Sequence, residues 1–183
     1  RARRPGEQPG GAGQVVIAHT GLGLTVGDAE LRGRARVRWE VLRGSLERVE
    51  LDVAHLGRDL KVEGPNVRSW DRSGDVLRIE LQQPTEDVLE VDLRWSEAVP
   101  AGTESSLGLA RVDPRGVFRR DMSLQLARDG EVELIPEVQG ASAVAARQLP
   151  RWGTGLVEGT PSAAYVGTQA SGELDLLRFE PVS

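Results

Sequence analysis

The feature that most constrains this chain is an alternation of apolar and charged side chains with a period of two residues. Across residues 31–41 the apolar positions are Leu31, Ala35, Val37, Trp39 and Val41, and most of the intervening positions are arginine or glutamate. This period is typical of a β-strand with one buried and one solvated face, whereas a helix repeats its apolar positions every three or four residues. The segment is therefore predicted to be a strand.

The same alternation recurs at residues 49–53, 77–81 and 89–95. Strands with one solvated face favour antiparallel over parallel pairing. Gly44-Ser45 and Asp129-Gly130 predict hairpins, and Ser73-Gly74-Asp75 and Gln83-Pro84-Thr85 predict turns. We therefore predict an all-β fold, an antiparallel and immunoglobulin-like β-sandwich, either one large sandwich or two packed in tandem.

Residues 1–13 contain three Arg, two Pro and four Gly, which is the composition of a flexible linker. Residues 14–97 are predicted to form a β-sandwich domain. Residues 104–183 form either a second β-rich domain or a continuation of the same sandwich. Within them, residues 151–172 are predicted to be a long loop with one strand at 163–166, while the alanines of residues 141–150 leave a helix open. Because position 1 is Arg, we expect the chain to be a piece of a longer protein or a processed product.

Composition excludes several classes of protein. The chain has no cysteine, which rules out disulfides, a thiol nucleophile and Cys-ligated metals. Of its 23 basic residues only Lys61 is a lysine. Its net charge is −5 and its arginines are interleaved with Asp and Glu along most of the chain, so nucleic acid is not an expected partner. The sequence has no apolar run of 18 residues, so we predict no membrane span within it.

The sequence contains few residues that favour catalysis. His19 and His55 are far apart and lack the spacing of a zinc motif. The Gly21-Leu22-Gly23 and Gly153-Thr154-Gly155 runs resemble phosphate-binding loops, but no plausible helix follows either of them. We predict no enzyme activity, no catalytic or metal-binding residue and no cofactor. An enzyme that uses a facing pair of dispersed carboxylates stays open as a third hypothesis.

Four tryptophans are the remaining lead. Trp39 and Trp95 fall on the apolar positions of their strands and are predicted to lie in the core. Trp70 and Trp152 lie in turn-like, polar surroundings, where an exposed indole can stack on a sugar ring or anchor a protein. These two are the candidate ligand-binding residues, and the alternative is that they fold back over an edge of the core.

The order of features from residue 46 to residue 95 is an alternating strand, a Gly64-Pro65 break, a strand with Trp70, a glycine turn and two further strands. This order resembles β-sandwich segments of bacterial cell-envelope proteins and the non-catalytic N-terminal β domain of M1-type aminopeptidases. The zinc signature of that peptidase family is missing, so the resemblance implies no functional residue.

Solvated strands, an acidic net charge and a linker-like start fit a non-catalytic, extracytoplasmic module within a larger bacterial envelope protein. Its expected role is protein interaction or structural spacing. Its expected location is periplasmic or extracellular, and a membrane-anchored parent is compatible with it. The alternative is a carbohydrate-binding module that uses Trp70 and Trp152. The expected partner is thus a protein, with carbohydrate as the second choice.

Overall fold

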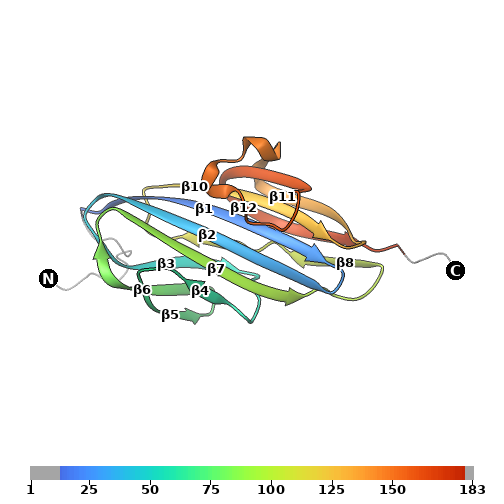
Figure 1. Ribbon diagram of the computed structural model, residues 1–183, viewed down its shortest axis with the longest axis horizontal. Helices are drawn as coiled ribbons and strands as arrows, with labels where there is room; N and C mark the ends of the chain where they lie inside the picture. Colours follow the sequence, from blue (N-terminus) through green and yellow to red (C-terminus); the bar gives the residue numbers. More distant parts are fainter. Residues whose placement is uncertain (1–12, 180–183) are drawn as a thin grey trace.

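A computed structural model describes residues 13–179, which form two β-sheets packed face to face (Figure 1). Apart from Gly13, the predicted linker lies outside the described residues. Two short 3-10 turns, η1 (Ala146–Gln148) and η2 (Arg151–Gly153), join β11 to β12. The strands are β1 (Val15–Gly27), β2 (Glu30–Arg43), β3 (Leu46–Ala54), β4 (Lys61–Glu63), β5 (Val67–Ser73), β6 (Val76–Thr85), β7 (Val88–Ala98), β8 (Glu104–Gly108), β9 (Arg111–Pro114), β10 (Arg119–Asp129), β11 (Glu133–Val144) and β12 (Ala163–Leu177).

The large sheet has the order β11-β12-β10-β1-β2-β7-β4, with β8 also paired to β12, and the small sheet has the order β5-β6-β3-β9. Among the described pairings only β1 with β10 is parallel. Both halves of the chain contribute to both sheets, because β10 joins β1 in the large sheet and β9 joins β3 in the small one. The predicted all-β sandwich is confirmed.

The predicted alternation sets which side chains fill the space between the sheets. Trp39 of β2 and Leu93 of β7 point inward from the large sheet, and Leu51 of β3 and Ile79 of β6 meet them from the small sheet. Each of these four side chains is at most 1% exposed. Trp95 is also buried, so the core assignment of both strand tryptophans is confirmed.

Two predicted hairpins are wrong. Gly44, at φ +86°, does turn the chain, but it carries β2 of the large sheet into β3 of the small sheet. Gly130, at φ +138°, follows β10, yet β12 lies between β10 and β11. A turn residue specifies the local backbone angle, whereas the pairing partner is chosen by strands that are remote in sequence.

Other turn predictions had mixed outcomes. Gly74 does join two paired strands, because Ser73 of β5 faces Val76 of β6. Pro84, in contrast, lies inside β6, which continues to Thr85. There the side chain of Asn66 donates to the Gln83 carbonyl at 2.9 Å and accepts from the Gln83 amide at 3.0 Å.

Residues 145–162, here called the strap, connect β11 to β12 and lie over the outer face of the large sheet, in orange at the top of Figure 1. The small sheet, with β5 at its edge, lies on the opposite side. The strand predicted at 163–166 is confirmed as the start of β12, whereas the loop predicted for 167–172 is wrong, because β12 continues from Ala163 to Leu177. The 141–150 stretch holds the end of β11 and η1 rather than an α-helix.

Candidate functional site

The strap packs on two glycines of β1. Outward-facing Gly21 and Gly23 leave a trough in the sheet, and the side chain of Leu156 fills it and is 4% exposed. A Cβ atom at Gly23 would lie 2.3 Å from the Leu156 carbonyl oxygen, and one at Gly21 would lie 2.6 Å from Leu156 Cδ1. The absence of side chains at these two positions is what admits the strap. The glycine runs that resembled phosphate loops thus pack a strap onto a sheet.

Polar contacts hold the strap on both sides of Leu156. The Glu158 amide donates to Thr25 Oγ1 at 3.1 Å, and the Leu156 amide donates to Gln125 Oε1 at 3.4 Å. At the far end the Ser162 amide donates to the Leu126 carbonyl at 2.7 Å. As a result, β1 and β10 are buried on both faces over their central residues.

Trp152 lies on the strap above His19. The two ring centroids are 5.2 Å apart, with an angle of 31° between the ring planes. His19 Nε2 lies 3.8 Å from Glu40 Oε1, and its Nδ1 lies 3.5 Å from Asp121 Oδ2. Among residues 13–179, no group of three or more His, Asp or Glu side chains has the geometry of a metal site.

Trp70 lies far from this cluster. It is on β5, the outer strand of the small sheet, and its side chain is 39% exposed. Trp152 is on the strap, over the other sheet. The structure therefore does not bring the two candidate tryptophans together, and a single platform made of both is not formed.

Beside the strap, the outer face of the large sheet is hollow. The strap covers the sheet only as far as β1. Beside the strap, over β2, β7 and β4, lies an open depression of about 660 Å³. Gly155, Leu156 and Val157 form one wall, and its floor and rim carry Arg32, Arg34, Lys61, Arg94, Ser96, Asp59 and Glu158. This hollow is the candidate site.

The outward arginines of β2 differ in their partners. Arg32 Nη2 lies 2.7 Å from Asp129 Oδ2 and 2.8 Å from Glu158 Oε2. The hydrogen bond to Asp129 raises the pKa of Arg32 above its ordinary value, and the charge of Glu158 adds to the effect. Arg36 Nε lies 3.5 Å from a carboxylate oxygen of both Glu90 and Asp92.

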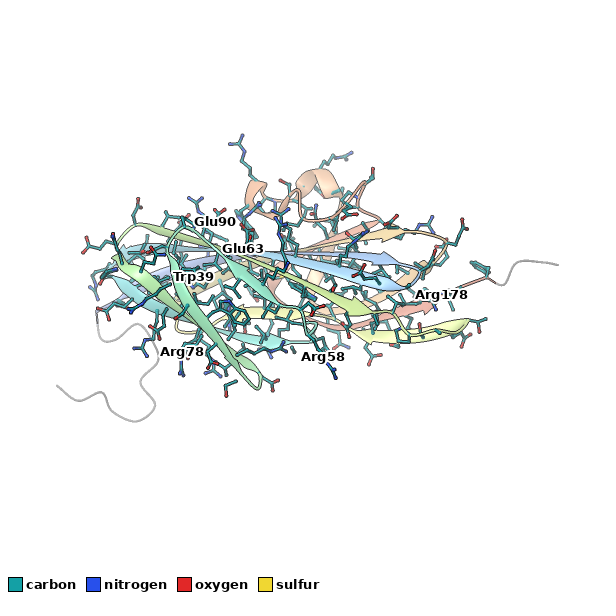
Figure 2. The ribbon with its side chains drawn as sticks, turned by 60° about the horizontal axis from the view of Figure 1, so that its bottom comes forward. Trp39, Arg58, Glu63, Arg78, Glu90 and Arg178 are labelled. Carbon is teal, nitrogen blue, oxygen red and sulfur yellow. The ribbon has the colours of Figure 1, made fainter. Side chains whose placement is uncertain are left out.

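Arg34 stands between these paired arginines. Within the described part of the chain it has no carboxylate within 4.0 Å, and neither has Arg94 or Lys61, its neighbours on β7 and β4. Acidic side chains do occur on the same face, and Figure 2 labels two of them, Glu63 of β4 and Glu90 of β7. The cluster of unpaired cations is therefore confined to the hollow and does not extend over the whole face of the sheet.

The sequence prediction missed Arg34, Lys61 and Arg94. Arg34 belongs to the alternating arginines that predicted β2, and Lys61 is the only lysine of the chain. Their proximity depends on the order β2-β7-β4, although β3 of the small sheet separates β2 from β4 along the chain. No local sequence signal encodes that order.

No protein-family model and no curated protein matches the chain. Solved structures do match it. The M1 zinc metallopeptidase from Deinococcus radiodurans, as a mutant bound to a Tyr-Ser-Ala substrate, is 16% identical with a TM-score of 0.45, covering 94% of this chain and 45% of that chain. The same enzyme without the mutation is 13% identical with a TM-score of 0.43, covering 90% and 42%. The chain thus spans less than half the length of these structures.

The matched enzyme is an M1-type peptidase, the family named in the sequence-based resemblance. No residue role, activity or partner is transferred from those enzymes to this chain. Separately, the structure contains no helix within residues 13–179 that is long and apolar enough to cross a membrane.

Proposed function

We propose that this chain is a non-catalytic β-sandwich module that binds a protein partner on the outer face of its large sheet. We place it within a larger bacterial envelope protein, in the periplasm or outside the cell. The observation that carries the proposal is the open hollow beside the strap, over β2, β7 and β4. It is built by specific packing, because Gly21 and Gly23 hold the strap at its border.

The lining of the hollow supports a protein rather than a small apolar molecule as the occupant. Small-molecule sites are mostly apolar clefts that enclose their ligand. This hollow is open along the strands, and its lining mixes long charged side chains with the apolar Leu60 and Trp95. Arginine is enriched at protein interfaces, where its apolar stem packs and its guanidinium hydrogen-bonds.

The experiment places a photo-crosslinking amino acid at Ser96 on β7 or at Val157 on the strap, both of which line the hollow. The control position is Ser69, an exposed residue of β5 on the small sheet. We expect one protein adduct that is shared by both hollow positions, absent from Ser69 and competed by an excess of the unlabelled chain. Equal adducts from both sheets, or none from the hollow, would contradict the proposal.

The alternative of carbohydrate binding now depends on Trp70 or Trp152 acting alone, because the two indole rings do not form one platform. Trp70 offers a partly exposed indole on an edge strand, and Trp152 a half-buried one against His19. A glycan array with the wild-type chain, Trp70→Ala and Trp152→Ala tests this alternative directly. Binding of a glycan that either substitution abolishes would favour it over protein binding.

A further inference from the structure

We propose that Arg34, Arg94 and Lys61 form an anion-binding row that recognises an acidic segment of the partner protein. Arg34 of β2 is directly opposite Arg94 of β7, and Arg94 is directly opposite Lys61 of β4. Three cations on three adjacent strands therefore share one line across the sheet, on its outward face. This inference rests on the proposed function, because it names the chemistry of the partner at the same hollow.

The row is unfavourable for the free protein. Side chains directly opposite on antiparallel strands have Cβ atoms about 5 Å apart, and like charges there repel. In the next row along the sheet, Arg36 faces Asp92 of β7, which faces Glu63 of β4, and Arg36 lies 3.5 Å from Asp92. The sheet therefore places acidic side chains in line with Arg36 in one row, whereas the adjacent row holds three cations, and an external anion would supply the missing negative charge.

Arg34 also has unused hydrogen-bonding capacity. Its Nε atom is buried and has no hydrogen-bond partner among the described residues. A buried donor without an acceptor is costly, and a charged one more so. Arg34 lies at the foot of the strap wall, because its neighbour on β1 is Gly23, beneath Leu156. A carboxylate that enters the hollow along this wall would reach the guanidinium.

The dimensions favour a chain of carboxylates over a single small anion. Neighbouring strands are about 4.8 Å apart, so the row spans roughly 10 Å. In an extended peptide, side chains on one face repeat about every 6.7 Å, within reach of flexible arginine and lysine stems. Two or three acidic residues on one side of an extended segment can therefore contact the whole row. Glu158 at the rim is already paired with Arg32, whereas Asp59 adds an unfavourable charge for such a ligand.

The experiment measures binding of a fluorescent hexaglutamate peptide to the purified chain by anisotropy, with hexaglutamine as the uncharged peptide. Arg94→Gln and Lys61→Gln should each weaken hexaglutamate binding by about five- to tenfold. Asp59→Asn should strengthen it. Raising the salt from about 0.1 M to 1 M should abolish it, because the screening length falls from about 10 Å to 3 Å.

The matched control is Arg48→Gln on the small sheet, which removes the same charge from an arginine that lies 3.7 Å from Glu80. Circular dichroism checks that each variant is folded. Any of three results would refute the proposal that this row binds an acidic segment. They are equal weakening by Arg48→Gln, equal binding of hexaglutamine, and binding of inorganic phosphate without binding of hexaglutamate. If Ser96 still crosslinks to a protein in that case, only the acidic chemistry is wrong and the proposed function stands.

Discussion

Replacing Gly23 by alanine should lift the strap from the large sheet while leaving the sandwich folded. The new methyl group would lie 2.3 Å from the Leu156 carbonyl oxygen, 2.6 Å from its carbonyl carbon and 2.7 Å from its Cβ. All three atoms belong to the backbone or to Cβ, so no change of rotamer can move them away. Contact at 3.4 Å would require the strap to move outward by about 1 Å.

The cost is limited by how strongly the strap is docked. Burial of the Leu156 side chain contributes about 1.5–3 kcal/mol. The two hydrogen bonds from the Leu156 and Glu158 amides add about 0.5–1.5 kcal/mol each, the longer one at the low end. The strap should therefore open at a cost of at most about 2.5–5 kcal/mol, while β1 keeps its pairing to β2 and β10.

Hydrogen–deuterium exchange with peptide-level resolution measures this opening. In Gly23→Ala, residues 152–158 should lose protection, while β1 and β2 keep theirs. Gly21→Ala is the matched comparison and should have a milder effect, because its nearest neighbour is the flexible Leu156 Cδ1 and its nearest backbone atom, the Trp152 carbonyl oxygen, is 2.9 Å away. Unchanged exchange in the strap of Gly23→Ala, or loss of protection throughout both sheets, would refute the reasoning.

Four further substitutions test other parts of the structure. Leu51→Ala and Leu93→Ala remove side chains that are 0% exposed, so each should lower the free energy of unfolding by about 2–5 kcal/mol. Urea titrations measure this loss, and unchanged midpoints would show that the core is misplaced. Arg94→Gln should raise the melting temperature by roughly 1–2 °C, because it relieves repulsion on both sides at an exposed site; a lower melting temperature would argue that the cations do not repel. Asp113→Asn removes the carboxylate that accepts from Arg120 at 2.7 Å and Arg111 at 3.1 Å, so calorimetry should show a loss of about 1–3 kcal/mol, in contrast to Asp75→Asn in the exposed β5–β6 turn.

The sequence predicts the fold class because a period of two is a local property. Residues 31–41 and 89–95 show it clearly, and both became long strands of the large sheet. The period of two fails to predict a strand that is buried on both of its faces. The central residues of β1, from Thr20 to Val26, are all buried, so the alternation that marks β2 is absent there.

Strand pairing and the candidate site could not be predicted from the sequence, for a different reason. Gly44 and Gly130 have the angles of turns, but the sheet order that follows them depends on distant strands. Likewise, Arg34 and Lys61 are 27 positions apart in the chain and come onto one line only through β7. The polar neighbours of Trp70 and Trp152 in the sequence indicate that each segment is exposed. They carry no information about which sheet the segment joins.

The position of β12 has a consequence for biosynthesis. This last strand lies between β11 and β10, and β8 also pairs with it. During synthesis, the large sheet therefore stays incomplete beside β10 until residues 163–177 have left the ribosome, with the edges of β10 and β11 unpaired. The chain must keep those edges from other nascent chains until β12 is inserted, so the large sheet is expected to be completed only after residues 163–177 have been synthesised.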